Sequence, residues 1–210
     1  MMKLLLVDDH AMMRTGLRQV VAQAFPDAEF GEAGSAREAL DQVLRNSWDV
    51  VLLDIELPDR DGLDLLKDLR LAAPQVPVLI LSGQPERDYG VQALKAGAAG
   101  FVAKTELATV LVDAIQKVCT RGRHVSPLLA ERLAHSLDPA ASRPLHDQLS
   151  AREFQILAAL ARGQSVGELA AQMSLSVKTV STYRTRLLKK MGMQSNAELM
   201  RYALQHGLVR

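Results

Sequence analysis

The stretch Val50-Val51-Leu52-Leu53-Asp54 decides the fold of this 210-residue chain, because four branched apolar residues run directly into a carboxylate. A continuous apolar run of this kind is typical of a strand that is buried on both faces in a parallel sheet. Sheets of this class bind their ligands beyond the carboxyl ends of the strands. Asp54, at the end of the run, is therefore predicted to be a nucleophile that accepts a phosphoryl group.

The composition indicates a cytoplasmic globular protein. Hydrophobic residues make up 48% and charged residues 23%, and 210 residues suit two small domains. The single cysteine, Cys119, excludes an internal disulfide, and because it closes an apolar helical pattern we expect a buried, inert thiol. No apolar stretch approaches the roughly 18 residues of a membrane span, so we predict no membrane partner.

The net charge of +1 hides an asymmetry between the two halves of the chain. Residues 1–119 hold 12 Lys and Arg against 18 Asp and Glu, a net of −6, whereas residues 120–210 hold 13 against 6, a net of +7. Opposite charges indicate two domains with different partners. The basic half is predicted to bind nucleic acid.

Apolar runs alternate with helical patterns over residues 1–119. The expected strands are 3–7, 28–33, 50–54, 77–81 and 101–103, and the expected helices are 12–24, 35–45, 61–71, 86–96 and 106–119. This alternation predicts an α/β fold, a five-stranded parallel doubly wound sheet with right-handed crossovers.

Polar residues follow four of these strands: Asp8 and Asp9 the first, Asp54 the third, Ser82 the fourth and Lys104 the fifth. Because the carboxyl ends of parallel strands share one edge, we expect these side chains to converge in one cleft. Clustered carboxylates repel one another unless a hard cation joins them, and oxygen ligands suit Mg²⁺. A metal and a lysine would neutralise a transferred phosphoryl group. Taken singly, the acids are equally good helix caps, the serine a turn residue and the lysine a solvated charge.

Four motifs in the first half resemble the receiver domain of bacterial two-component response regulators. They are Leu5-Leu6-Val7-Asp8-Asp9-His10, Leu53-Asp54-Ile55-Glu56-Leu57-Pro58-Asp59-Arg60-Asp61-Gly62, Leu81-Ser82-Gly83 and Gly97-Ala98-Ala99-Gly100-Phe101-Val102-Ala103-Lys104. The resemblance covers residues 1–119 and implies a flavodoxin-like fold.

The resemblance also assigns roles to the cleft. It implies that a histidine kinase or a small phosphodonor phosphorylates Asp54, and that Asp9 and Asp54 bind Mg²⁺ directly while Asp8 acts through water. The backbone carbonyl of Glu56 would complete the protein ligands. Ser82 and Lys104 would bind the phosphoryl group. Phe101 matches an aromatic switch position, whose ring turns inward when the serine moves toward the phosphate; without the resemblance an ordinary packed strand residue is the favoured interpretation.

Two residues depart from the family pattern. Ala11 replaces a common proline at the first turn of a helix, where alanine is well tolerated. Glu56 adds a carboxylate beside the site, where many relatives have a neutral residue. Its charge would slow either hydrolysis of the acyl phosphate or phosphorylation by anionic donors, and the sequence does not assign the sign.

Residues 120–147 are predicted to form a linker, because they contain Pro127, Pro139 and Pro144 and show a helical pattern only at 128–137. From residue 148 the pattern is entirely helical. Ser150 and Glu153 form a capping-box pattern before the first helix, and further helices are expected at 166–173, 177–191 and 197–206. Two short helices joined by a tight turn are typical of a helix-turn-helix.

The helix at 177–191 carries the DNA-binding prediction. Apolar residues occupy one face, and no acid occurs between Glu168 and Glu198. Cations for phosphates and short polar groups for base edges are what a major-groove helix needs. A solvated basic face is the alternative. The polar positions are Lys178, Thr179, Ser181, Thr182, Thr185, Arg186, Lys189 and Lys190.

Residues 149–191 resemble the LuxR-type four-helix DNA-binding domain in the segments Leu149-Ser150-Ala151-Arg152-Glu153, Leu175-Ser176-Val177-Lys178-Thr179-Val180-Ser181-Thr182-Tyr183 and Leu187-Leu188-Lys189-Lys190-Met191. Joined to a receiver, this domain is similar to the NarL/FixJ class. The resemblance implies base readout by Ser181, Thr182, Thr185 and Arg186, phosphate contacts by the other four positions, and a homodimer on double-stranded DNA through the last helix.

The sequence thus predicts a response regulator in which phosphorylation of Asp54 controls DNA binding and transcription, with a sensor histidine kinase as partner and RNA polymerase as a further one. We expect no enzymatic turnover beyond self-catalysed phosphoryl transfer and slow autodephosphorylation. Two alternatives stay open: a constitutive DNA-binding protein with a vestigial receiver, and an aspartyl-phosphate phosphatase, for which Glu56 is the only nearby second acid. Opposite charges also suggest an off-state in which the receiver covers the basic helix; receiver dimerisation is the other route to activation.

Overall fold

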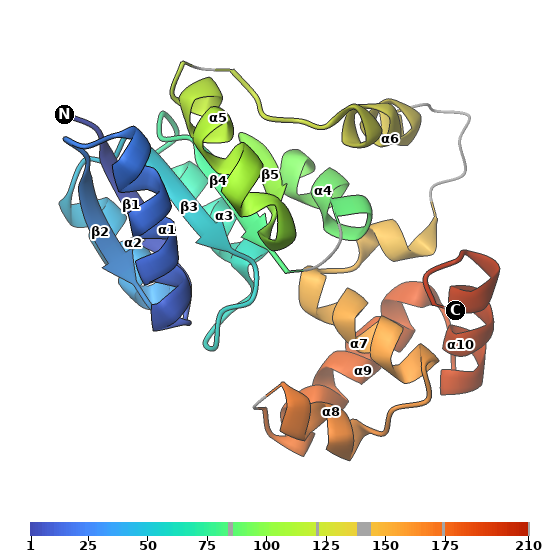
Figure 1. Ribbon diagram of the computed structural model, residues 1–210. Coiled ribbons are helices and arrows are strands. Elements are labelled where there is room, and N and C mark those ends of the chain that lie inside the picture. The colour runs from blue at the N-terminus through green and yellow to red at the C-terminus, as the bar shows by residue number, and fades with distance from the viewer. Residues whose placement is uncertain (84–85, 121, 138–143, 174, 210) are drawn as a thin grey trace. The chain divides into compact units, whose positions relative to one another are not determined.

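The computed structural model describes residues 1–83, 86–120, 122–137, 144–173 and 175–209. The chain divides into two compact units, Met1–Ala141 and Ser142–Arg210, and each is considered by itself. The first unit contains the sheet and the second is helical (Figure 1). This division follows the change from alternating to purely helical patterning along the sequence.

The first unit is built on five parallel strands in the order β2-β1-β3-β4-β5. Their bounds are β1 (Lys3–Val7), β2 (Glu29–Ala33), β3 (Val50–Asp54), β4 (Val78–Ser82) and β5 (Gly100–Ala103). Both β3 and β4 are buried along their whole length. The predicted α/β class and the five parallel strands are confirmed. The order of the strands in the sheet is known only from the structure.

Helices cover both faces of this sheet. Helices α1 (Ala11–Ala24) and α5 (Leu107–Cys119) pack together on one face, and α2 (Ala36–Arg45) and α3 (Gly62–Ala72) pack together on the other (Figure 1). Helix α4 (Glu86–Lys95) packs beside β5, and a short 3-10 turn, η1 (Lys104–Glu106), precedes α5. The core between the sheet and the α1/α5 layer is aliphatic and buried, including Leu4, Leu6, Leu17, Val21, Leu52, Leu79, Leu111 and Ile115.

The segment expected as a linker lies partly against the first unit. The backbone N–H of His124 donates to the carbonyl of Ala99 at 3.0 Å, and the carbonyl of His124 accepts from Phe101 at 3.3 Å. Helix α6 (Pro127–Leu137) then packs on α4, with Leu129 fully buried. The predicted helix is present, but His124 and helix α6 belong to the fold of the first unit and are not part of a free connector. Residues 138–143 of the expected linker lie outside the described residues.

The expectation of a buried Cys119 is wrong, because the residue is exposed. It is the last residue of α5, one position after the buried Val118. The apolar pattern that ends in Cys119 extends one residue beyond the buried part of the helix.

The second unit begins with the 3-10 turn η2 (Leu145–Gln148), followed by α7 (Ala151–Ala161), α8 (Val166–Gln172), α9 (Val177–Met191) and α10 (Asn196–Gln205). The capping box of Ser150 and Glu153 is present, and a second one joins Ser165 to Glu168. Gly192 ends α9 in the left-handed conformation, with φ of 64°, as glycine commonly does. All four predicted helices are present. In the described part of the chain, no helix combines the length and apolar character that crossing a bilayer requires.

Candidate functional site

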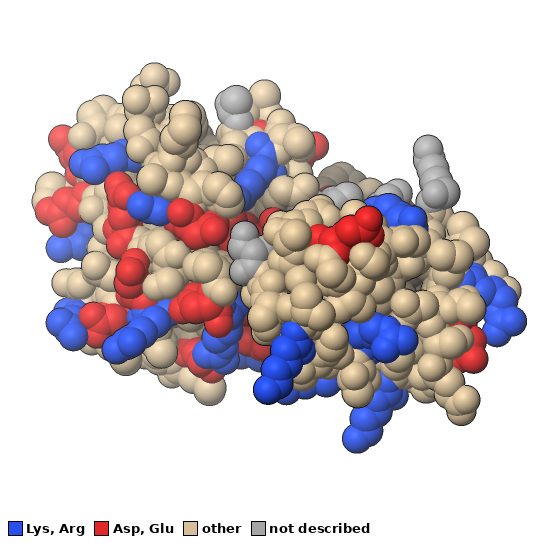
Figure 2. Space-filling view, turned by 90° about the horizontal axis from the view of Figure 1, so that it is seen from below, with Lys and Arg blue, Asp and Glu red and all other residues tan. Residues whose placement is uncertain are grey.

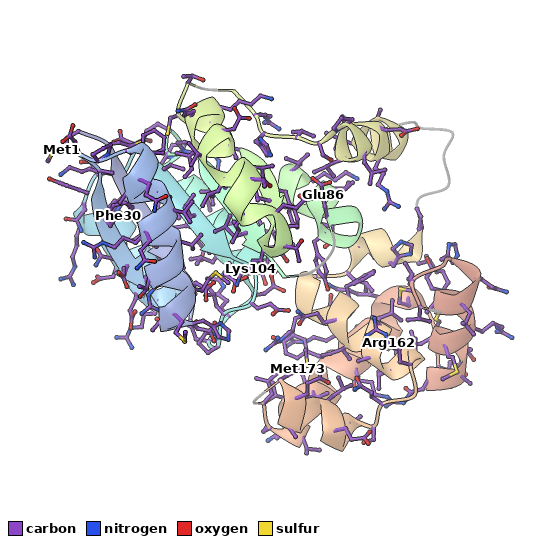
Figure 3. The ribbon with its side chains drawn as sticks, in the orientation of Figure 1. Met1, Phe30, Glu86, Lys104, Arg162 and Met173 are labelled. Atoms are coloured by element: carbon purple, nitrogen blue, oxygen red, sulfur yellow. The ribbon has the colours of Figure 1, made fainter. Side chains whose placement is uncertain are left out.

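The predicted convergence of polar side chains occurs at the carboxyl end of the sheet, where Asp8, Asp54 and Lys104 meet. Val7 lies beside Leu53 in the register of β1 and β3, so the next residues of the two strands, Asp8 and Asp54, are neighbours. The Nζ atom of Lys104 donates to Oδ2 of Asp8 and to Oδ2 of Asp54, each at 2.7 Å. Figure 3 labels Lys104 at this end of the sheet. One ammonium therefore pairs with two carboxylates that are both about 1% exposed.

Burial dominates the electrostatics of Asp54. It raises the pKa of the carboxyl group from 3.8 to about 6, although the charge and hydrogen bond of Lys104 oppose that rise and Asp8 adds to it. Burial also acts to lower the pKa of Lys104, but contact with Asp54 and Asp8 outweighs burial and the net pKa is raised. The site thus holds an excess of negative charge that one ammonium does not fully offset.

The donor set at this edge fits a hard divalent cation. Ligand atoms of Asp8, Asp9, His10 and Asp54 all lie within 4.8 Å of one another, and three of the four are carboxylate oxygens. Asp8 and Asp54 are buried, whereas Asp9 is exposed and open to water. Mg²⁺ prefers carboxylate oxygen and keeps several waters, which this half-open arrangement accommodates.

His10 is a member of this cluster to which the sequence reasoning assigned no role. Its Nδ1 lies 2.7 Å from Oδ1 of Asp9 and 3.2 Å from Oδ1 of Asp8, and its side chain is 70% exposed. Its backbone N–H also donates to Asp8 at 2.8 Å. The position directly after two acids was the available signal. The backbone contact fixes the direction of the buried Asp8 carboxylate.

Ser82 and Phe101 lie where the predicted sheet places them. Ser82 ends β4, is fully buried and pairs in register with Ala103, the residue before Lys104. The hydroxyl and the ammonium therefore come from adjacent strand ends. Phe101 is buried in this structure, and its role as a switch residue stays a prediction.

The loop after β3 is folded back tightly on the site. The backbone N–H of Glu56 donates to Oδ1 of Asp54 at 3.3 Å, and Glu56 forms a β-bridge with Asp61. A Cβ atom at Gly62 would lie 2.5 Å from the carbonyl oxygen of Asp54, so only glycine fits there. Farther along, both carboxylate oxygens of Asp59 accept hydrogen bonds from the first backbone N–H groups of α2. The loop is thus held to its own strand and to a neighbouring helix.

The second candidate surface is the polar face of α9. Val180, Leu187 and Met191 are buried on its opposite face, against the rest of the second unit. Thr179 is half-buried and the other seven predicted DNA contacts are exposed, namely Lys178, Ser181, Thr182, Thr185, Arg186, Lys189 and Lys190. On the face of the molecule in Figure 2, Lys and Arg predominate over the helical unit, whereas acidic side chains gather on the sheet unit.

Several of these side chains also have partners within the domain. Lys190 lies 2.6 Å from the buried Glu153 carboxylate, which joins the end of α9 to the start of α7. The hydroxyls of Thr182 and Thr185 donate to backbone carbonyls one turn earlier in the helix. The two hydroxyl oxygens keep lone pairs that can accept a hydrogen bond from a DNA base. Lys190 is thus the predicted contact with the strongest structural role of its own.

Comparisons with known proteins agree with the division into a receiver fold and a helical domain. Residues 4–116 match the family described as the response regulator receiver domain, and residues 147–203 match the bacterial regulatory proteins of the luxR family. Response regulator UvrY of Escherichia coli K12 is 32% identical over 99% of this chain and 96% of its own length. Transcriptional activator protein ExaE of Pseudomonas putida is 36% identical over 100% of this chain and 99% of its own.

A solved structure shows the same fold. RcsB from Salmonella enterica serovar Typhimurium, solved bound to a promoter in the presence of phosphomimetic BeF3−, is 21% identical, with a TM-score of 0.61 over 96% of this chain and 97% of that one. Its likeness supports the order of a receiver fold and a helical domain. The two family matches and the full-length relatives establish the class: the chain belongs to the NarL/FixJ response regulators, with a receiver domain followed by a LuxR-type DNA-binding domain.

Proposed function

We propose that Asp54 is the phosphoacceptor of this regulator and that its phosphorylation controls DNA binding and transcription. The observation that carries the proposal is the buried Asp54 carboxylate, which contacts Lys104 at 2.7 Å and lies beside Asp8 and Asp9. A histidine kinase or a small phosphodonor would supply the phosphoryl group. The test is mass spectrometry of the full-length protein after incubation with acetyl phosphate and Mg²⁺. A phosphoryl group on Asp54 is expected, and unmodified protein, or label retained in Asp54→Asn, would contradict the assignment.

Mg²⁺ would be held by the carboxylates of Asp9 and Asp54 and the backbone carbonyl of Glu56, with Asp8 acting through water. Bound there, the ion would screen the incoming phosphoryl oxygens from the carboxylates. The carboxylate oxygens of Asp8, Asp9 and Asp54, which lie within 4.8 Å of one another, support the carboxylate part of this ligand set. The raised pKa of Asp54 supports it too, because a group that burial pushes toward its neutral form gains most from a nearby cation.

In the transfer step, a carboxylate oxygen of Asp54 attacks phosphorus, and the bond from phosphorus to the donor breaks with its electron pair staying on the donor. The Lys104 ammonium, which pairs with Asp54 before transfer, would then pair with a phosphoryl oxygen, and the hydroxyl of Ser82 would donate to another. Movement of Ser82 toward the phosphate would repack the buried Phe101. The chain catalyses its own phosphorylation and slow dephosphorylation in this scheme and turns over no external substrate.

Glu56 is proposed to set the lifetime of the phosphorylated state. Its backbone N–H donates to Asp54 at 3.3 Å, and Glu56 lies only two residues from the acceptor in the chain. The test is the half-life of phosphorylated Glu56→Asn against the native protein. A changed half-life, in either direction, supports the role, and an unchanged one removes Glu56 from the mechanism.

On DNA, α9 would enter the major groove. Base contacts are proposed for Ser181, Thr182, Thr185 and Arg186, and phosphate contacts for Lys178, Thr179, Lys189 and Lys190. The exposure of seven of these eight residues supports the assignment. The protein would bind as a homodimer through α10 in the cytoplasm, with RNA polymerase as a further partner. Footprinting of a target promoter by the full-length protein tests it: paired half-sites are expected, and binding without sequence preference would contradict it.

The off-state is proposed to be one in which the acidic receiver covers the basic helix. The charges of −6 and +7 on the two halves of the chain support this masking. It predicts that residues 147–210 alone bind DNA better than the unphosphorylated whole. Equal binding would favour activation by receiver dimerisation, which sedimentation with and without BeF3− detects directly.

A further inference from the structure

Arg14, on α1, joins the acid cluster to the edge strand of the sheet. Its Nη1 donates to the backbone carbonyl of Asp8 at 2.7 Å, and its Nε donates to Oε2 of Glu32, on β2, at 2.9 Å. Its side chain is only 18% exposed, although it is a charged residue on a surface helix. The donors of a planar guanidinium point in fixed directions, whereas those of an ammonium rotate about the end of the side chain.

The carbonyl that Arg14 binds belongs to the peptide joining Asp8 to Asp9. Because a peptide group is planar, fixing this carbonyl fixes the plane from which the Asp9 residue departs. The backbone N–H of Asp8 is held as well, since it donates to Ala33 at 3.1 Å. The Asp9 side chain is 32% exposed, and its carboxylate lies 2.7 Å from the ring of His10, which is itself 70% exposed and so is a weak anchor. The direction of the Asp9 carboxylate therefore depends mainly on the backbone that Arg14 holds.

A simple surface ion pair does not account for these contacts. Such a pair is worth at most about 1 kcal/mol and requires no hydrogen bond to a loop carbonyl. Arg18, one turn farther along α1, illustrates the simple case: it is largely exposed, lies 3.8 Å from Glu32 and covers the ring of Phe30 at 5.4 Å. Both arginines share Glu32, but the recorded contact with the loop belongs to Arg14.

We propose that Arg14 is a positioning residue for the cation site: anchored by Glu32, it orients the peptide between Asp8 and Asp9 so that the Asp9 carboxylate points at the ion. The inference rests on the proposed function, in which Asp8, Asp9 and Asp54 hold Mg²⁺. It deepens that function by naming a residue outside the carboxylate set that governs affinity for the cation.

The sign of the effect separates positioning from simple charge. Arg14 is a cation near a cation site, so removing its charge reduces repulsion and, by Coulomb's law alone, tightens Mg²⁺ binding. Loss of the orienting hydrogen bond has the opposite effect and weakens binding. Weaker binding after removal of a positive charge is therefore the signature of positioning.

The experiment is a calorimetric Mg²⁺ titration of the full-length protein and three variants. In Arg14→Gln the dissociation constant for Mg²⁺ is expected to rise about tenfold, the lower end of what loss of an outer-shell partner of a metal ligand costs. Arg14→Lys keeps the positive charge but loses the planar pair of guanidinium donors, so a smaller rise in the dissociation constant is expected. Arg18→Gln is the matched control, because it removes the same charge from the same helix and the same Glu32; its dissociation constant should stay equal or fall slightly.

A second readout uses labelling by acetyl phosphate at varied Mg²⁺. Arg14→Gln should need more Mg²⁺ for its half-maximal rate but approach the native rate at saturation, while the metal-free variant still unfolds cooperatively. Native or tighter Mg²⁺ binding in folded Arg14→Gln would overturn the positioning role of Arg14 but leave the proposed function standing. If Arg14→Gln does not fold, native affinity in Arg14→Lys would overturn it. If the native protein neither binds Mg²⁺ nor is labelled, the proposed function itself fails.

Discussion

The Nζ atom of Lys104 lies 2.7 Å from Oδ2 of Asp54, across the ends of two strands that β4 separates in the sheet. The same ammonium contacts Asp8 at 2.7 Å. Without a phosphoryl group, the lysine that would stabilise that group thus partly offsets the repulsion between the two acids. In the proposed mechanism, transfer would require the ammonium to exchange a carboxylate for a phosphoryl oxygen.

Replacing Lys104 should therefore cost stability before any ligand is considered. Lys104→Met leaves Asp8 and Asp54 buried without their cation, which is expected to lower the free energy of unfolding by about 3 kcal/mol at pH 7.5. The loss should shrink near pH 5.5, where Asp54 can take up a proton. Urea unfolding at the two pH values measures both effects. Lys67→Met, which removes an exposed pair with Asp64, is the control and should cost under about 1 kcal/mol.

The pH dependence of stability should reveal the raised pKa of Asp54. Burial raises it from 3.8 to about 6, so the folded state holds the proton more tightly than the unfolded state. The stabilisation linked to this group is fully present below about pH 4 and is lost as pH rises through about 6. Without metal, the native protein should lose up to about 3 kcal/mol relative to Asp54→Asn between those limits. A difference between the two proteins that is independent of pH would contradict the raised pKa.

Gly62→Ala should damage the cation site through the backbone. The added methyl group would lie 2.5 Å from the carbonyl oxygen of Asp54, so the loop carrying Glu56 has to move. We expect weaker Mg²⁺ binding and a stability loss of about 2 kcal/mol. Gly16→Ala, in α1 where nothing lies near the added atom, is the contrasting change and should stabilise by about 0.5–1 kcal/mol. Calorimetry and urea unfolding would both register the contrast, and native Mg²⁺ binding in Gly62→Ala would count against the proposed role of the loop.

Two residues of α9 should separate base readout from phosphate contact. Arg186→Ala is expected to cost about 1–3 kcal/mol on the specific site and to relax preference at one base position. Lys189→Ala should weaken binding to all sequences alike and lower the slope of affinity against salt by about 1. Both side chains are exposed, so folding should be preserved. Fluorescence anisotropy with specific and scrambled duplexes at several salt concentrations measures both the loss of specific affinity and the change in the salt slope. The same behaviour for both variants would contradict the assignment.

The elements and the cleft were predictable because they depend on local patterns. An apolar run such as 50–54 specifies a buried strand, and parallel strands end at a common edge, so the convergence of Asp8, Asp54 and Lys104 follows from their order. The helix starts were predictable for the same reason, since a capping box such as that of Ser150 and Glu153 lies within four residues.

Contacts between distant segments were not predictable in this way. Nothing in the spacing of Arg14 indicates that its guanidinium reaches both the carbonyl of Asp8 and Glu32. The pairing of His124 with the start of β5 was missed because three prolines and a weak pattern favoured a connector. Cys119 and Lys190 show the same limit. Helical periodicity predicts on which face of a helix a residue lies, but it does not predict where along the helix burial stops, as at Cys119. Nor does it predict a partner from another helix, such as Glu153 for Lys190.

The central claim is that phosphorylation of Asp54 controls DNA binding, and the most direct test is the affinity of the full-length protein for a target promoter with and without BeF3− and Mg²⁺. We predict that BeF3− tightens binding by the native protein at least tenfold, corresponding to about 1.4 kcal/mol, and leaves Asp54→Asn unchanged. Equal affinities of the native protein in both conditions, or an equal gain in Asp54→Asn, would contradict the account.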